Sequence, residues 1–302
     1  MQHALHVDRV TKRFGDFVAV NEISLAVPTG TIYGFLGPNG AGKTTTIRMV
    51  MSILYPDQGT ITVLGNPVPE AVKDRLGYLP EEKGLYKKMK TGELITYFGR
   101  LKGMNGHDAK RRSVELLQRF GLGDWVDKKC DTLSKGMGQK VQILATLVHD
   151  PELIILDEPF SGLDPVNVEL VRDVILALKK EGRTVIFSTH GMEQAEQICD
   201  KVLLIHKGKK ILDGTLREVK ASGPRTVIID YDGGNGRVFE GLPGVERVND
   251  SGKHAELTLN DRTDRQALLK ALVDRITIHR FDTREPSLHE IFVRAVGGHV
   301  DE

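Results

Sequence analysis

The feature that most constrains this chain is a glycine-rich segment with the pattern G-x-x-x-x-G-K-[ST]; it consists of Gly37, Pro38, Asn39, Gly40, Ala41, Gly42, Lys43 and Thr44. The apolar run 31–36 before it predicts a buried strand. After it, apolar residues from Ile47 to Leu54 recur at helical spacing and predict an amphipathic helix. A loop between such a strand and helix turns its backbone N–H groups toward an anion, and the helix N-terminus adds partial positive charge. The residues therefore predict an α/β domain that binds phosphate groups.

Two side chains of this loop can act on a bound nucleotide. Lys43 is predicted to reach the β- and γ-phosphates, and Thr44 is predicted to ligate Mg²⁺. We count Thr45, the next residue, among the nucleotide-binding residues. The alternative is an ordinary glycine turn, which the strand–loop–helix context disfavours.

Two adjacent carboxylates, Asp157 and Glu158, follow the apolar run 153–156. This run predicts a second buried strand, and open α/β sheets bind ligands at the carboxyl ends of their strands. Asp157 is predicted to serve the Mg²⁺ site, directly or through water. Glu158 is predicted to orient and deprotonate the attacking water. A solvated strand end is the alternative, which the phosphate-binding loop disfavours.

Short apolar strands alternate with amphipathic helices from the start of the chain to about residue 220. A third strand is predicted at 184–187, after a helix that Asp164 caps and that ends near Gly182. Strands separated by helices of this length predict a parallel sheet with right-handed crossovers. Residues from about 85 to 149 contain helix patterns and no convincing strand, which indicates a helical insertion.

The pattern changes beyond the linker-like residues 221–224. Strands are predicted at 226–231, 256–259 and 276–279, and a helix at 265–274. The last helix opens with Ser287 and Glu290, the two side chains of a capping box. Residues 225–302 are therefore predicted to form a small α+β domain, and we find no catalytic constellation in its sequence.

Composition excludes several classes of protein. The 302 residues carry 42 Lys and Arg against 41 Asp and Glu, a net charge of +1, whereas a nucleic-acid-binding protein usually has a basic excess. No stretch approaches the roughly 18 to 20 apolar residues that cross a bilayer. Residues 1–8 lack the pattern of a secretory leader, and Cys130 and Cys199 form neither a CxxC pair nor a zinc set. We therefore expect a cytosolic protein that does not bind nucleic acid.

Several motifs, in order along residues 1–220, resemble those of the ATP-binding subunit of an ABC transporter. Besides the glycine-rich loop and the acidic pair, Ser134 and Gly136 stand where the LSGGQ signature of the family belongs. Asp164 ends a segment that resembles the D-loop, and His190 resembles the switch histidine that contacts the γ-phosphate. Phe14 falls where an aromatic side chain usually stacks on adenine.

This resemblance implies a P-loop NTPase cassette with a mixed sheet core and a helical insertion, which binds ATP and Mg²⁺ and hydrolyses ATP. In the family, the signature serine and glycine amides close over the nucleotide that the partner subunit holds. Ser134, Gly136 and Asp164 thus imply a self-dimer or a paired ATPase subunit. Bound nucleotide then stabilises the closed state only by its differential affinity for that state.

Three of these residues have alternative roles. His190 could be a structural histidine, and Phe14 could be a core aromatic. Ser134 could be a plain N-cap of the following helix. The two roles of Ser134 are compatible, because a serine at a helix start is also where a γ-phosphate would be met.

The chain departs from the family pattern in two places. Glu81 stands where a glutamine is usual, and we expect it to ligate Mg²⁺; an acidic turn formed with Glu82 is the alternative. Lys135 and Met137 replace a glycine and the glutamine of the signature. Lys135 can add a cation near the phosphates of the partner subunit, whereas Met137 cannot hydrogen-bond as glutamine does.

The segment 84–86 and the terminal domain resemble ATPase subunits that pair with ABC-2-type export permeases, a group that includes sodium-extrusion and drug-export systems. The resemblance implies a separate membrane permease and a location on the cytoplasmic face of the cell membrane. We expect the permease to dock in a groove between the core and the helical insertion, near residues 85–89. The terminal domain is expected to be regulatory or to support the dimer. Two other functions stay open: a non-transport ABC ATPase of DNA repair or translation, and a cassette that binds ATP as a switch with little hydrolysis.

Overall fold

The computed structural model describes residues 3–82, 84, 86–223, 225–233, 237–260 and 263–297. The chain divides into two compact units, Met1–Thr215 and Leu216–Glu302. This division lies one short helix earlier than the linker that the sequence suggests at 221–224. Pro224 of that linker and Leu85 of the expected permease contact lie outside the described residues.

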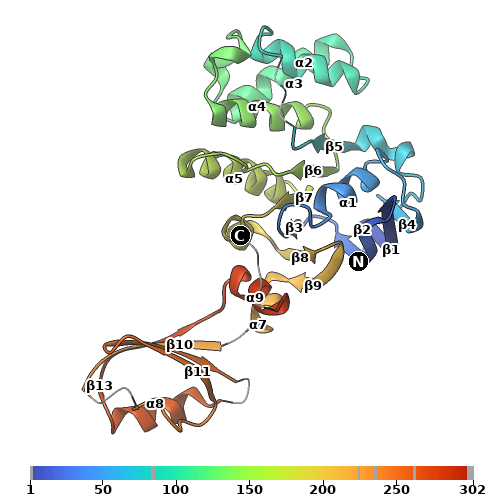
Figure 1. The fold of residues 1–302 in the computed structure, drawn as a ribbon. Coiled ribbons are helices and arrows are strands. Elements are labelled where there is room, and N and C mark those ends of the chain that lie inside the picture. The colour runs from blue at the N-terminus through green and yellow to red at the C-terminus, as the bar shows by residue number, and fades with distance from the viewer. Residues whose placement is uncertain are drawn as a thin grey trace. The chain divides into compact units, whose positions relative to one another are not determined.

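The first unit is built on a mixed sheet with the strand order β5-β6-β7-β3-β8-β9 (Figure 1). The strands are β3 (Ile32–Leu36), β5 (Leu76–Leu79), β6 (Leu153–Asp157), β7 (Thr184–Thr189), β8 (Lys201–His206) and β9 (Lys209–Thr215). Neighbouring strands are parallel except β8 and β9, which are antiparallel. Every residue of β3, β6 and β7 is buried, as expected of apolar strands covered on both faces. The mixed sheet core predicted from the sequence is confirmed.

Helices follow the central strands along the chain. The helices α1 (Lys43–Val50), α5 (Pro165–Lys180) and α6 (Met192–Ile198) come after β3, β6 and β7. As predicted, Asp164 is the N-cap of α5, and its side chain accepts a hydrogen bond from the backbone N–H of Asn167. The helix α1 is shorter than its apolar pattern suggests. It ends before Ser52, which turns the chain with a left-handed φ of 52°, so that Leu54 packs on the core from outside the helix.

An antiparallel sheet that the sequence analysis does not anticipate forms the N-terminal part of this unit. Its strand order is β2-β1-β4, with β1 (His3–Phe14), β2 (Phe17–Pro28) and β4 (Gln58–Val63). Figure 1 shows these strands beside α1. Buried side chains such as Val7 and Val20 join the hydrophobic core that also contains Phe35 of β3 and Ile47 of α1. This sheet therefore packs against the element that carries the glycine-rich loop.

The predicted helical insertion contains α2 (Thr91–Leu101), α3 (Gly106–Arg119) and α4 (Lys135–Leu147). The first apolar residue of each helix comes two or three positions after the helix begins. The helix starts are set instead by the polar N-cap residues Lys90, Asn105 and Ser134, which an apolar pattern does not mark. Short 3₁₀ turns span Pro69–Arg75, Gly123–Trp125 and Cys130–Thr132. Figure 1 shows the three helices grouped together beyond the β5 edge of the central sheet.

The second unit has an antiparallel sheet in the order β11-β12-β10-β13, with α8 along one face (Figure 1). Its elements are α7 (Leu216–Ala221), β10 (Arg225–Asp232), β11 (Val245–Asp250), β12 (His254–Leu259), α8 (Arg265–Val273), β13 (Thr277–Arg284) and α9 (Leu288–Ala295). Alternate residues of β10 and β12 enter a core with Leu268 and Leu272 of α8. The capping box of Ser287 and Glu290 is present at α9. The strand β11 is an addition to the predicted elements.

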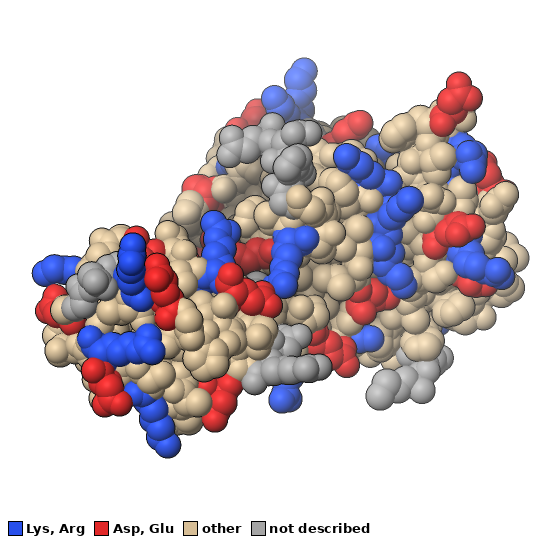
Figure 2. All heavy atoms as spheres, turned by 60° about the horizontal axis from the view of Figure 1, so that its bottom comes forward, with Lys and Arg blue, Asp and Glu red and all other residues tan. Residues whose placement is uncertain are grey.

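Charges of both signs are dispersed over the surface. In the view of Figure 2, Lys and Arg side chains alternate with Asp and Glu, as the near-zero net charge suggests. Within the described ranges, the chain contains no helix that is both long and apolar enough to cross a lipid bilayer.

Candidate nucleotide and catalytic site

The glycine-rich loop joins the end of β3 to the start of α1, as its sequence context predicts. Gly42 is the N-cap of α1 and has a φ of 106°, which side chains other than glycine rarely adopt. A Cβ at Gly42 would lie 2.6 Å from the carbonyl oxygen of Ala19 on β2. Glycine is therefore required here both by the backbone conformation and by the close approach of β2.

Lys43 is buried and its ammonium group is held between the loop and the end of β6. Its Nζ donates hydrogen bonds to the carbonyl oxygens of Gly37, at 2.8 Å, and Pro38, at 3.1 Å. The same Nζ lies 3.4 Å from Oε1 of Glu158. A phosphate group in the loop would meet this cation beside its ion pair with Glu158, and it would be a stronger partner than the neutral loop carbonyls.

Asp157, the last residue of β6, brings a carboxylate to Thr44 of the loop. Its Oδ1 accepts hydrogen bonds from Thr44 Oγ1, at 3.2 Å, and from Ser188 Oγ. Its buried Oδ2 accepts no hydrogen bond from any described residue. Burial raises the pKa of Asp157, and the negative charge of Glu158 raises it further. A divalent cation would offset both effects, and its ligands could include Oδ2 and the Thr44 hydroxyl.

Glu158 lies directly beyond β6 with a left-handed φ of 48°. Its backbone N–H donates to Ser188 Oγ at 3.0 Å, which ties the end of β6 to β7. Its Oε2 lies 3.1 Å from Nδ1 of His190, whereas its buried Oε1 accepts no hydrogen bond from the described chain. Although Oε1 also faces Lys43 Nζ, it can still accept a hydrogen bond, so this buried carboxylate can take a proton from a nearby water. Thus the sheet brings the two predicted catalytic residues, Glu158 and His190, into contact.

A cavity of about 510 Å³ lies over the loop. It is lined by Phe14, Phe17, Ala19, Asn39, Gly40, Ala41, Gly42, Lys43, Thr44, Thr45, Glu81 and Glu158. Its volume is in the range of small-molecule and cofactor sites. The structure therefore brings Glu81 and Phe14, which lie far apart in the sequence, to one cavity with the loop.

The aromatic side chains of this cavity are open to solvent. Phe14 is 48% exposed, which contradicts the alternative of a core aromatic, and Phe17 is 64% exposed. Both can offer a face to a planar base, since stacking tolerates many geometries. Phe17 is not among the predicted site residues. It is the first residue of β2, directly after the turn at Gly15 and Asp16, and no periodicity of the sequence marks it.

Ser188 is a second residue that the sequence analysis did not assign. It contacts both the side chain of Asp157 and the backbone of Glu158. The signal was available, because Asp157 of β6 is paired with Ser188 of β7 in the parallel register. Side chains paired at the carboxyl ends of adjacent parallel strands meet at the ligand-binding edge of the sheet.

Seven predicted residues are not part of the cavity lining. Four of them are hydrogen-bonded to residues that are: Gly37, Pro38, Asp157 and His190. The other three, Ser134, Gly136 and Asp164, have no such link in the described chain. Ser134 is the N-cap of α4, and its Oγ accepts a hydrogen bond from the backbone N–H of Met137 at 3.2 Å. Gly136 lies against the side chain of Asn167, which leaves no room for a Cβ. The signature segment and the start of α5 thus form a group of their own, separate from the loop of the same chain.

Comparison with known proteins covers both units. A family profile described as "ABC transporter" matches residues 20–161. A profile described as "ATP-binding protein DrrA1-3-like, C-terminal domain" matches residues 214–296. The first match includes the glycine-rich loop and the acidic pair, and the second extends over most of the second unit.

Similar proteins and structures agree with these matches. The uncharacterized ABC transporter ATP-binding protein YhaQ of Bacillus subtilis (strain 168) is 41% identical over 97% of this chain and 98% of its own length. The Nod factor export ATP-binding protein I of Sinorhizobium fredii is 33% identical over 97% of this chain and 86% of its own length. The solved structure of cbiO1 from Clostridium perfringens, part of the ABC transporter complex cbiONQ, is similar with a TM-score of 0.68 and 27% identity. That similarity covers 74% of this chain and 92% of that chain.

Proposed function

We propose, since this chain belongs to the family of ABC transporter ATP-binding proteins, that it drives export through a separate ABC-2-type membrane permease. Proteins of this family are ATPases that work with membrane permease subunits, and the chain is such an ATPase. The export direction is supported by a relative that spans both units and is named for the export of Nod factor. The ABC-2 assignment is supported by the DrrA-like terminal domain.

The observation that carries this proposal is the meeting of Lys43 and Glu158 in the lining of one cavity. Asp157 is not itself part of the lining, but it accepts a hydrogen bond from Thr44, which is. We assign the loop amides and Lys43 to the phosphates of ATP. Thr44 and Asp157 are assigned to Mg²⁺. Glu81, which lines the same cavity as Thr44, is assigned to it as well. When bound, Mg²⁺ neutralises charge on the β- and γ-phosphate oxygens. The unsatisfied Oδ2 of Asp157 and the raised pKa of its carboxyl group fit such a cation.

The residues of the chemical step follow from the contacts at the end of β6. Glu158 is positioned to accept a proton from the attacking water through Oε1, which accepts no hydrogen bond from the described chain and lies 3.4 Å from Lys43 Nζ. His190 holds the other carboxylate oxygen at 3.1 Å and is half exposed, so its ring can turn toward a phosphate. Phe14 and Phe17 are assigned to the adenine base.

Two subunits are needed in this scheme. Ser134, Gly136 and Asp164 lie outside the cavity of their own chain, and we assign them to the nucleotide of the partner subunit. The amide groups at the start of α4 suit the charge of a γ-phosphate. The partner is a second copy of this chain or a paired ATPase subunit. A cassette that binds ATP without hydrolysis is disfavoured, because every group assigned to the chemical step is present.

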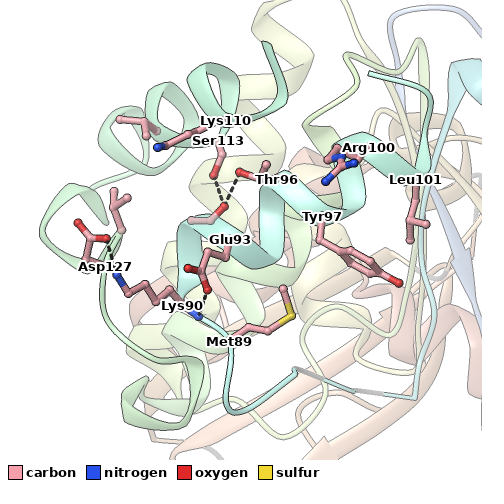
Figure 3. Close-up of a pocket in the computed structure, with 13 residues that line it drawn as sticks. Met89, Lys90, Glu93, Thr96, Tyr97, Arg100, Leu101, Lys110, Ser113 and Asp127 are labelled. Carbon is pink, nitrogen blue, oxygen red and sulfur yellow. Dashed lines mark hydrogen bonds and ion pairs between the residues drawn. The ribbon is translucent and has the colours of Figure 1, made fainter. Parts of the chain in front are cut away.

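A permease surface is proposed on the helical insertion. Tyr86, Tyr97 and Leu101 are exposed, and the rings of Tyr86 and Tyr97 meet edge to face with centroids 5.8 Å apart. Beside them lies a cavity of about 750 Å³ along α2, which Met89 and Lys90 border at one end (Figure 3). Exposed apolar side chains that gather in one place are typical of a protein interface. We assign this surface to a cytoplasmic segment of the permease, which would hold the chain at the cytoplasmic face of the membrane.

The permease surface is tested by copurification. A Tyr86→Asp variant is expected to lose the permease, because a charge enters the interface, whereas Ile53→Asp is expected to retain it. The two wild-type side chains are matched in exposure, at 52% and 53%, and Ile53 lies outside the insertion. Recovery of the permease at wild-type yield with Tyr86→Asp would count against this surface.

The function itself is tested by transport-coupled hydrolysis. The chain and its copurified permease, reconstituted in vesicles, are expected to release phosphate from ATP only when Mg²⁺ is present. Lys43→Gln is expected to abolish this release, since it removes the cation that faces the phosphates. Hydrolysis that persists unchanged with Lys43→Gln, or the absence of any permease partner, would contradict the proposal.

A further inference from the structure

A second cavity, of about 510 Å³, lies entirely within the C-terminal unit and gathers positive charge. Its cationic lining residues are Arg217, Lys220, Arg225, Arg265 and Arg284. Glu285 is the one acidic residue among the lining residues that the structure describes. We call this cavity the basic pocket.

The charge of the basic pocket does not follow from the composition of its unit. Residues 216–302 contain 13 Lys and Arg against 15 Asp and Glu, so the unit is slightly acidic. Among the described lining residues are five of these 13 cations and a single one of the 15 acidic residues. Like charges repel one another, so a fold gathers them in one cavity at a cost in stability.

The fold of the sheet places these cations together. The strand β10 begins where its antiparallel neighbours β12 and β13 end, so that Arg225 pairs with Leu259 and Thr226 with Arg284. Arg265 is the first residue of α8, a helix that packs on this sheet. Residues from α7 complete the lining. The pocket is thus built at one end of the sheet by segments distant in sequence.

Most of this charge is not neutralised by the protein. Arg284 has two acidic neighbours, Glu290 at 3.4 Å and Glu256 at 3.7 Å. Arg217, Arg225 and Arg265 form no ion pair with the described part of the chain. Arg284 is set aside with its two glutamates, and Lys220 is left out because it has an interaction of its own. The three remaining arginines then face one carboxylate, that of Glu285, which leaves an excess of two positive charges. An anion carrying at least two charges would balance the pocket.

We propose that the basic pocket binds a ligand through a phosphate group with two or more negative charges. Arginine presents a fork of N–H donors that matches the oxygens of a phosphate. The hydroxyl groups of Thr226 and Thr283 also line the pocket and can donate to phosphate oxygens, while Val227 and Leu259 give it an apolar part. The ligand comes either from a lipid headgroup or from a free phosphorylated molecule. The site lies outside the nucleotide cavity, and its occupation does not depend on the proposed export function.

The test uses the full-length protein saturated with ADP, so that the glycine-rich loop is occupied. Pyrophosphate is titrated by calorimetry, and flotation is measured with vesicles of phosphatidylcholine alone or mixed with phosphatidic acid, whose phosphate is a monoester that can carry two charges. The pocket variant is Arg225→Gln with Arg265→Gln. The control is Arg247→Gln with Lys270→Gln, which removes the same charge from two exposed residues of the unit that are not among the lining residues.

The pocket variant is expected to weaken binding of pyrophosphate or of phosphatidic acid vesicles by at least about tenfold, because charge-assisted hydrogen bonds are lost. The control is expected to change it by less than about twofold, as surface charges usually do. A selective loss of pyrophosphate binding identifies a free phosphorylated molecule, and a selective loss of vesicle binding identifies a lipid headgroup. Arg217→Gln, on a separate element, should weaken the same probe if the first variant misfolds. Equal losses in pocket and control variants, or no binding of either probe, would overturn the proposal.

Discussion

Glu158 offers the sharpest test of the chemistry, since glutamine has the same shape and lacks only the negative charge. The wild-type side chain is buried, with its carboxylate oxygens 3.4 Å from Lys43 Nζ and 3.1 Å from His190 Nδ1. A glutamine side chain can turn its carbonyl oxygen toward Lys43 and donate from its amide nitrogen to Nδ1 of His190, in the tautomer that leaves Nδ1 unprotonated. The backbone N–H of residue 158 keeps its bond to Ser188. Glu158→Gln should therefore preserve the cavity while it removes the base.

The size of the effect follows from that role. Loss of a positioned general base slows a chemical step by roughly 10²- to 10⁴-fold, which raises the barrier by about 3 to 5 kcal/mol. Binding of ATP rests on the loop amides and Lys43, which the substitution leaves in place. We therefore expect the dissociation constant for ATP to change by less than about fivefold, since the contacts that bind the substrate and the transition state equally are retained.

Single-turnover phosphate release and equilibrium binding of ATP separate these two effects, and light scattering follows dimer formation. The variant is expected to accumulate as an ATP-bound dimer, because the nucleotide that holds the subunits together is not hydrolysed. Glu193→Gln, an exposed residue of α6, is the matched control and should behave as wild type. Turnover of Glu158→Gln within about threefold of wild type would remove Glu158 from the role of base.

Three further results are expected. Because burial raises the pKa of Asp157, its charged form destabilises the nucleotide-free fold as the pH rises through that pKa. Asp157→Asn should therefore raise the melting temperature most at neutral pH and less at acidic pH. A difference in melting temperature between variant and wild type that does not change with pH would refute this. The variant should also lose the stabilisation that Mg²⁺ and ATP together give the wild type. Phe14→Ala should weaken ATP binding by about tenfold and Phe14→Tyr should not, as fluorescent-nucleotide titration can measure. Leu257→Ala, in the fully buried core of the second unit, should cost about 2 to 5 kcal/mol in urea unfolding, and Val273→Ala, on an exposed side chain, should cost less than about 0.5 kcal/mol.

The central part of the fold could be predicted because it depends on local patterns. The loop 37–44 fixes a strand before it and a helix after it, and the acidic pair follows an apolar run. Since parallel strands end at the same edge, these two segments had to meet there. The contacts of Lys43 with Glu158 and of Thr44 with Asp157 have this origin.

Other elements carry no comparable pattern. The strands β1 and β2 pair with several register shifts, and Arg9 and Glu22 have left-handed φ values, so their apolar residues do not alternate regularly. The edge strand β11 is mostly exposed, and its sequence therefore contains no buried face to recognise. Phe17 joins the nucleotide cavity through the turn that precedes it, which no periodicity of the sequence marks.

The most direct test of the account is the rate of hydrolysis per subunit as the protein is diluted, with light scattering on the same samples. We propose that the site around each nucleotide is completed by Ser134, Gly136 and Asp164 of the partner subunit, since these residues do not line the cavity of their own chain. The rate per subunit should therefore fall in parallel with the fraction of dimer and recover when the protein is concentrated. A monomeric sample that hydrolyses ATP at the full rate would contradict the account.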